Sequence, residues 1–534
     1  MCMQHFTISK VRLAVYAICF SLPLSIAALT PCHAADIYSS NMVNVRWDNT
    51  LRYTAAFRLT PQNSRILASI NGDDGDRNLD QGLISNRLEL VSRFDLSHGD
   101  FGLHISAAAW YDTVYHTHTA NHSPSTYNPI GIPSTEFAPG VRDLHGQHAE
   151  LRDAFVYGSF SVRHVPISFR LGRQTLVWGE SLFFDDNSIA AAQAPVDYTN
   201  SFLGRYDYAA DTFLPVSQLS LTAQPVSDLS FSFYYQFEWR SSRQPGDGSY
   251  FSTVDYIGAG ANRLFLSSQR YLIRAGDERP SSSGQFGFAT HLTAGEFTFG
   301  VYAIRFNSKD PIAILSINSS NSVQTGDVGI YRLAYPEGIN LYGLSFGTML
   351  DETDIAGEFS FRHATPIGRY VLRPESDPAH TSSSDDDNAY NRTDQFDARV
   401  SATATLGPAW LWDSADLSVE IAADDLAYTA SGLPKPNPQS GRFVLHGRVK
   451  LEPRYFEILP NLDLTVPIDI GHDIVGHYAN YSQYSGTNDI AIGISAIYRS
   501  VWKADIMLTD FIGSPTYQPL ADRAFISVRL ERTF

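Results

Sequence analysis

The sequence predicts an all-β protein, a transmembrane antiparallel up-and-down β-barrel of about 18 strands, with 16 as the alternative. Three observations predict it: apolar and polar side chains alternate along many segments, short and long connections alternate between those segments, and the last segment ends on an aromatic residue. Alternation places one set of side chains on each face of a strand. A membrane barrel needs this pattern because one face meets lipid and the other meets the lumen.

The alternation is clearest near the start of the chain. Apolar residues from Val45 to Leu59 oppose polar residues from Asn44 to Arg58, and Leu88, Leu90 and Phe94 oppose charged neighbours in the next segment. Further segments with the same pattern begin at Phe101, Ile167, Leu229 and Leu462. A soluble sandwich, propeller or β-helix would also alternate, but such compact folds rarely carry many long loops.

Connections between these segments alternate in length. The short ones are Ser97 to Asp100, Ser161 to Pro166, Pro225 to Asp228, Thr293 to Glu296, Asp351 to Asp354 and Ser500 to Trp502. The long, polar ones are Thr60 to Leu83, His116 to His148, Gly179 to Val216, Ser241 to Ser283, Asn307 to Gly338 and Thr365 to Asp394. Bacterial barrels have short periplasmic turns and longer outer loops, so both termini are expected in the periplasm. The strand count is least determined from Trp410 to Trp502.

The final segment resembles the C-terminal strand of outer-membrane barrels. Phe534 is preceded at intervals of two by Leu530, Val528 and Ile526, while Arg532 stands where an apolar residue is expected. An arginine at a strand end can extend its charged group toward water.

Residues 1–34 read as a secretory signal peptide that is cleaved after Ala34. Lys10 and Arg12 precede an apolar stretch from Leu13 to Leu29. The segment Cys32-His33-Ala34 then ends on a small residue, as a signal-peptide cleavage site does. An uncleaved anchor and a lipoprotein acylated at Cys32 are the alternatives. We therefore expect export to the outer membrane and a single barrel domain over residues 35–534.

Composition excludes several classes of function. All three cysteines, Cys2, Cys19 and Cys32, lie in the signal, so the mature chain has no disulfide or thiolate metal site. The formal net charge of −17 argues against nucleic acid as a partner. Beyond the signal, no apolar run approaches the length of a membrane-spanning helix. Aromatic residues form 13% of the chain, as two interfacial girdles would require.

Several motifs resemble the proteobacterial domain-of-unknown-function 1302 family of outer-membrane β-barrel proteins. The most specific are Leu-Gly-Arg-Gln-Thr-Leu-Val-Trp-Gly-Glu-Ser at 171–181 and Tyr-Pro-Glu-Gly at 335–338. Others lie at 71–78, 85–87, 150–155, 234–239, 357–358 and 522–525. The resemblance spans essentially the whole mature chain and implies a barrel in the outer membrane. It transfers no catalytic or binding residue and modestly favours hydrophobic cargo.

Two outer connections contain residues that metal ions could use. Asp74, Asp76, Asn78 and Asp80 alternate as in a calcium loop, but the glycine and the bidentate glutamate of such a loop are replaced by Leu79 and Ser85. A solvated acidic turn is therefore expected instead. His116, His118 and His122 share the next connection, where a mobile surface loop is favoured over a transition-metal site. Asp385 to Asp387 are expected at a charged loop tip. No cofactor or metal is predicted.

The connection at 179–216 is too apolar for a wholly solvated loop. It contains Leu182, Phe183, Phe184, Ile189, Ala190 to Ala192, Phe202, Leu203 and Phe213. We hypothesise that it folds inward and constricts the lumen, the alternative being an outer loop packed on its neighbours.

These features predict a channel or uptake protein for small apolar or amphipathic molecules, and no enzyme. The alternatives are a porin for polar or acidic solutes, an outer-membrane hydrolase, and a structural or surface-binding barrel. Expected partners are membrane lipid and lipopolysaccharide, the small-molecule cargo, the barrel-assembly machinery and an unidentified periplasmic protein. Candidate lumen-facing residues, from facing alone, are Arg46, Arg52, Arg87, Glu89, Arg93, Asp95, Arg170 and Arg529.

Overall fold

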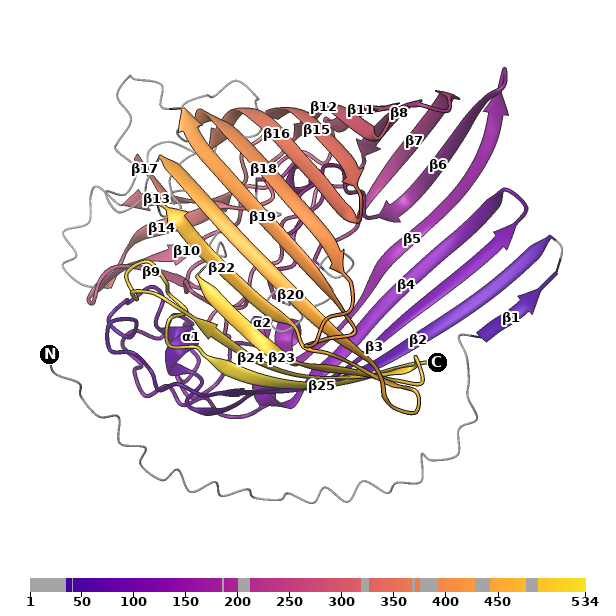
Figure 1. Ribbon diagram of the computed structural model, residues 1–534. Coiled ribbons are helices and arrows are strands. Elements are labelled where there is room, and N and C mark those ends of the chain that lie inside the picture. Colours follow the sequence, from indigo (N-terminus) through magenta and orange to yellow (C-terminus); the bar gives the residue numbers. More distant parts are fainter. Residues whose placement is uncertain are drawn as a thin grey trace, which may run out of the picture.

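The computed structural model contains a closed antiparallel β-barrel of 18 strands (Figure 1). It describes residues 35–40, 42–184, 187–199, 212–317, 326–366, 370–374, 392–427, 442–476 and 488–534. The predicted signal peptide and Asp385 to Asp387 lie outside these residues. No helix in the described ranges is long and apolar enough to cross a bilayer.

The barrel strands follow one another around the wall in chain order. They are β2 (Val43–Arg58), β3 (Gly82–His98), β4 (Phe101–Asp112), β5 (Gln147–Val162), β6 (Val165–Gln174), β7 (Val216–Val226), β8 (Leu229–Gln236), β11 (Gln285–Ala294), β12 (Phe297–Phe306), β15 (Ile339–Leu350), β16 (Thr353–Pro366), β18 (Arg392–Leu406), β19 (Ser414–Ala427), β20 (Phe443–Leu459), β21 (Leu462–Thr465), β22 (Ile468–Val475), β23 (Asp489–Tyr498), β24 (Trp502–Phe511) and β25 (Phe525–Thr533). β21 and β22 share one place, because both pair with β20 and with β23. This resolves the strand count in favour of 18 over 16.

The barrel closes where the first and last strands meet. β25 pairs antiparallel with β2, from Thr533 opposite Thr50 to Phe525 opposite Arg58. β1 (Ala35–Ser39) pairs with the preceding part of β2, from Trp47 to Asn44, and so continues the edge beyond the end of β25. Closure gives the first and last barrel strands, β2 and β25, a partner on each side, as backbone groups in hydrocarbon require.

Exposure of side chains follows the predicted alternation. On β2, Leu51, Tyr53 and Phe57 are exposed large apolar residues, whereas Thr50 and Thr54 are buried. Arg532, the exception in the C-terminal pattern, stacks its guanidinium over the Trp502 ring at 5.0 Å from the centroid. Its charge therefore meets an aromatic face.

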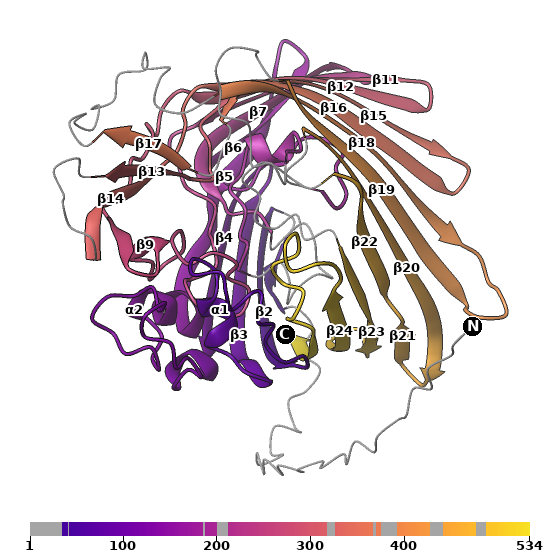
Figure 2. The ribbon, with the colours of Figure 1, turned by 90° about the vertical axis from the view of Figure 1, so that its left-hand side faces the viewer.

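Three of the long connections fold into a separate five-stranded sheet. It contains β9 (Arg263–Ser267), β10 (Arg270–Arg274), β13 (Ile312–Ile317), β14 (Gly326–Ala334) and β17 (Tyr370–Pro374), in the order β17-β13-β14-β10-β9. Leu264, Leu272, Leu315, Val328 and Leu333 contribute to its apolar core. Figure 1 shows this sheet on the left, at the opposite end of the barrel from β1, and Figure 2 shows it above α1 and α2.

The connections at 241–283, 307–338 and 365–394 are long, as expected, but they also contain short strands that the sequence analysis did not predict. Two of the pairings, β9 with β10 and β13 with β14, lie within one connection. The other two, β10 with β14 and β13 with β17, join different connections, and these long-range contacts could not be recognised in the sequence. The helices are short: α1 (Asp74–Arg77), α2 (Pro139–Val141), η1 (Thr113–His116), η2 (Arg142–Gly146) and η3 (Ala190–Ala192).

The alternation of faces predicts how charge on the outer wall affects stability. Val528, near the middle of β25, and Leu350, at a turn, are both exposed apolar residues. We expect Val528→Arg to lower the free energy of unfolding by roughly 2–4 kcal/mol, and Leu350→Arg by about 1 kcal/mol or less, because the cost of a cation falls toward the interface. Denaturant unfolding in lipid vesicles measures both values, with Val528→Leu as the control. Equal costs at the two positions would contradict this assignment of lipid depth.

Candidate functional site

The candidate site is the interior of the barrel, where the chain between β6 and β7 enters. We call residues 175–184 and 187–199 the inner segment. Its backbone is bonded to Glu358 of β16 and Glu420 of β19, strands that lie far from β6 in the order around the wall. Phe359 and Ile421, the next residues along these strands, are exposed on the outer face. Glu358 and Glu420 therefore point inward, and the inner segment crosses the interior to reach them.

Glu420 is the main anchor of the inner segment. Its carboxylate accepts hydrogen bonds from the backbone N–H groups of Leu182 at 3.0 Å, Phe183 at 2.5 Å and Phe184 at 3.0 Å. The Ser181 hydroxyl donates to the same carboxylate at 3.2 Å. Glu358 accepts from the N–H groups of Glu180 at 2.8 Å and Ile189 at 3.0 Å. These carboxylates satisfy donors that have no strand partner.

Cations of the wall bind the carbonyl groups of the same segment. Arg399 on β18 donates to the Phe184 carbonyl at 3.0 Å, and Arg362 on β16 donates to the Ser188 carbonyl at 2.7 Å. Lys309, which follows β12, donates to the Ala192 carbonyl at 2.9 Å. The wall thus supplies both acceptors and donors, which hold a segment without regular structure in one place.

The inner segment also packs an apolar side against the wall. Trp178, Ile189 and Ala192 form a buried cluster with inward-facing residues of β8, β11, β12 and β15. The Trp178 ring lies 5.0 Å from the Tyr234 ring, centroid to centroid, in an edge-on arrangement. Leu182, Phe183 and Phe184 remain half-buried. Phe202 and Leu203, also part of the predicted constriction, lie outside the described residues, and a role in constricting a solute path stays a prediction.

Charged side chains of the strands pair along much of the interior. Arg448 on β20 contacts Asp469 at 2.6 Å and Asp489 at 2.7 Å. His446 contacts Asp473 at 2.7 Å through Nδ1, and Arg399 contacts Asp424 at 3.3 Å. These pairs place cationic side chains of β18 and β20 beside carboxylates of β19, β22 and β23, which makes this part of the wall polar.

Four of the predicted lumen-facing residues lie in such pairs. Arg52 contacts Glu531 at 2.8 Å and Glu89 at 3.6 Å. Arg87 contacts Glu89 at 3.3 Å, and its guanidinium lies 4.3 Å from the centroid of the Trp110 ring. Arg529 contacts Asp505 on β24 at 3.3 Å.

The other four lie nearer the short turns and are less enclosed. Arg46 is exposed and contacts Asp48 at 2.7 Å, Asp95 contacts His104 at 2.6 Å, and Arg170 lies over the Phe155 ring. Arg93 is exposed and opposes Asp48 in the register of β2 and β3. That any of these eight residues lines a solute path remains a prediction.

Sequence reasoning missed the residues that anchor the inner segment. Glu358, Arg362, Arg399 and Glu420 occupy inward positions on β16, β18 and β19. The alternation of faces was visible in these strands, because residues two apart share a face: Asp397 shares one with Arg399, and Glu420 shares one with Ala422. Nothing in the sequence indicated that these four residues contact residues 180–184 and 188–189, because the contact joins positions far apart in the chain.

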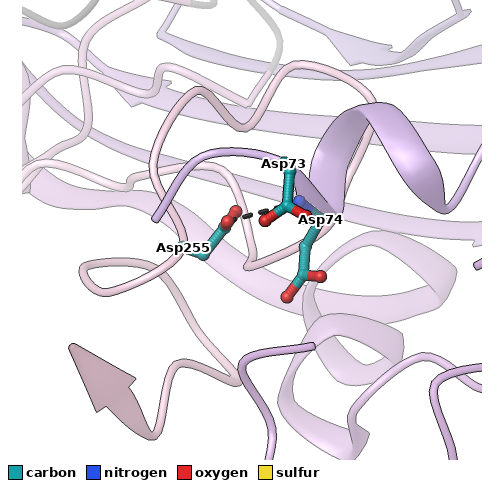
Figure 3. A group of neighbouring side chains, drawn as sticks. All are labelled: Asp73, Asp74 and Asp255. Carbon is teal, nitrogen blue, oxygen red and sulfur yellow. Dashed lines mark hydrogen bonds between the residues drawn. The ribbon is translucent and has the colours of Figure 1, made fainter. Parts of the chain in front are cut away.

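The metal candidates of the outer connections are arranged differently from the sequence pattern. Asp74, Asp76 and Asn78 are fully buried, so the expected solvated turn is wrong for them, and only Asp80 is exposed. Asp76 pairs with Arg58 at 2.6 Å, and the Asn78 side-chain amide donates to the Gly248 carbonyl at 2.9 Å. In the described residues, one group of three or more potential metal ligands converges, and it consists of Asp73, Asp74 and Asp255 (Figure 3). None of the three histidines belongs to this group.

The closed strand order and the apolar outer face define a membrane β-barrel. Because the inner segment lies inside it, the protein belongs to the class of barrels whose interior is partly filled by their own chain. By sequence, residues 14–534 match the family described as protein of unknown function (DUF1302), and the chain belongs to this family. No curated protein matches the chain.

Solved outer-membrane channels are similar to the chain at low identity. OccAB1 of Acinetobacter baumannii is 10% identical, with 92% of this chain and 96% of that chain covered, at a TM-score of 0.45. OccD3 of Pseudomonas aeruginosa is 12% identical, with coverage of 92% and 90% and a TM-score of 0.39. OccK2 of the same organism, solved with glucuronate, is 8% identical, with coverage of 92% and 97% and a TM-score of 0.39. The fold assignment rests on the closed strand order and not on these scores.

The anchoring of the inner segment predicts a strong effect of Glu420. Glu420→Ala removes the acceptor of four half-buried donors, and a donor that loses its partner where water cannot replace it costs roughly 1–3 kcal/mol. We expect a loss of at least about 2 kcal/mol in the free energy of unfolding, measured by denaturant titration of the folded barrel. Glu352→Ala, at an exposed turn position, is the matched control. Equal stability of the two variants would show that the Glu420 contacts are not formed.

Proposed function

We propose that this protein is an outer-membrane channel for small apolar or amphipathic molecules, delivered by a cleaved signal peptide. One observation carries the proposal: a segment with apolar side chains is held across the barrel interior by charged groups of the wall. A barrel of 18 strands encloses a wide lumen, so selectivity requires an internal element of this kind.

The chemistry of the inner segment favours amphipathic cargo. Leu182, Phe183 and Phe184 are half-buried and lie beside Glu420, Arg399 and His446, the last at 5.5 Å between its ring centroid and that of Phe184. A molecule that passes there meets apolar contacts and paired charges together. Ion pairs, whose charges cancel, attract an acidic solute less than an unpaired cation would. A porin for polar or acidic solutes is the second candidate, because arginines recur along the wall.

Deletion of residues 182–192 tests the constriction. We expect the single-channel conductance in planar bilayers to rise severalfold, because the segment no longer occupies the interior. The double variant Glu358→Ala/Glu420→Ala should give an intermediate value, since it loosens the anchors and leaves the apolar packing in place. Heat-modifiable electrophoretic mobility serves as the control for folding. Unchanged conductance of a folded deletion variant would rule out the constriction.

Competition between solutes separates the two transport candidates. We expect a medium-chain alkanol to reduce ionic current through the wild-type channel at concentrations where succinate has no effect. The deletion variant should lose this block, because the apolar contacts are gone. Block by succinate alone would favour the porin for acidic solutes. Absence of any conductance from the wild-type barrel would instead favour a structural or surface-binding role.

A further inference from the structure

A buried group of carboxylates connects the outer loops at the end of the barrel that carries the small sheet. We define the acidic cluster as Asp73, Asp74 and Asp255, and Asp247 lies next to it. Asp73 and Asp74 belong to the β2–β3 connection, and Asp247 and Asp255 belong to the β8–β9 connection. One carboxylate oxygen each from Asp73, Asp74 and Asp255 lies within 4.8 Å of the other two (Figure 3).

A third connection contributes neutral groups that fix the cluster. The Asn128 backbone N–H donates to Asp74 at 2.7 Å, and the Asn121 side-chain amide donates to the other oxygen of Asp74 at 3.1 Å. The Asp74 backbone N–H donates to Asp255 at 3.3 Å. These bonds orient Asp74 and Asp255 without adding positive charge.

The cations near the cluster do not balance its charge. Arg77 pairs with Asp73. The Arg523 guanidinium lies close enough to act on Asp255, but it donates to the backbone carbonyls of Tyr250 and Ser252, the latter at 2.7 Å. Most of the buried negative charge therefore has no cation of its own, and uncompensated burial of carboxylates is costly.

Asp247 is an independent sign of a ligand. Its side chain is buried, and its carboxylate meets the carboxylate of Asp255, while neither of its oxygens has an N–H or hydroxyl donor among the described residues. It lies beside Asp74 and Asp255, whose negative charges, after burial itself, raise the pKa of Asp247 well above its usual range. One oxygen of Asp73 and one of Asp255 also lack a donor in the described part of the chain. Buried polar atoms in native proteins are nearly always satisfied.

We propose that the acidic cluster binds one divalent cation, best matched by Ca²⁺, which joins the β2–β3 and β8–β9 connections. All the donors are carboxylate oxygens, which hard cations prefer and which soft transition metals do not. Oxygens up to 4.8 Å apart fit around an ion with Ca–O distances of about 2.4 Å, whereas Mg–O distances of about 2.1 Å require a tighter group. This site is independent of the proposed transport function.

Metal binding to the full-length folded barrel in detergent, stripped with EDTA and free of lipopolysaccharide, tests the proposal. We expect about one Ca²⁺ bound per chain by elemental analysis after dialysis, because one cluster of this kind lies within the residues that the structure describes. CaCl₂ should raise the melting temperature of the stripped protein more than MgCl₂ does, since the ion binds the folded state. Absence of bound Ca²⁺ in the wild-type protein would overturn the site and leave protonated carboxyls as the account of the cluster.

Variants locate the ion. Asp247→Asn and Asp255→Asn should each lower Ca²⁺ affinity by at least about tenfold, measured by calorimetric titration. Asp80→Asn makes the same charge change at an exposed position of the β2–β3 connection and should leave the affinity unchanged. If all three variants bind Ca²⁺ as tightly as the wild-type protein, the ion is bound elsewhere. If the cluster variants do not fold, anomalous scattering from Tb³⁺ in wild-type crystals decides: a peak between Asp74 and Asp255 supports the site, and a peak only elsewhere rejects it.

Discussion

Satisfaction of backbone hydrogen bonds in lipid is the constraint on which the structure depends. No water is present in the hydrocarbon region to bond a free N–H or C=O group, so a sheet can cross it only as a closed ring. The pairing of β25 with β2 closes that ring, and β1 extends the pairing of β2 where β25 ends. The alternating side chains follow from closure, because each strand then has one face toward lipid and one toward the interior.

The same constraint governs the chain inside the barrel. The inner segment has few regular backbone partners, and the wall replaces them with side chains of both signs: Glu358 and Glu420 accept, and Arg362, Arg399 and Lys309 donate. A carboxylate accepts several bonds at once, so Glu420 can hold three successive N–H groups. The polar face of the barrel is thus both the candidate lining of a path and the support of the inner segment.

The outer end of the barrel is held by different means. Strands from three connections form one small sheet, and buried polar contacts join the β2–β3, β4–β5 and β8–β9 connections around Asp74. Arg58 of β2 continues this network toward the barrel through Asp76. The described parts of these connections therefore form one layer at this end of the barrel. An ion in the acidic cluster would join two of the connections at a point where their own charges repel.

The sequence by itself determined the barrel, the two faces of its strands and the order of short and long connections, because these depend on a period of two and on local turn composition. It also marked residues 179–216 as unusual, because their apolar content is visible without a partner. Only the tertiary structure decided the strand count around β21 and β22, the small sheet, and the contacts of Glu358 and Glu420 with the inner segment. Asp74 shows why: its neighbours in the chain imitate a calcium loop, while the carboxylates that converge on it include Asp255, which chain folding alone brings near.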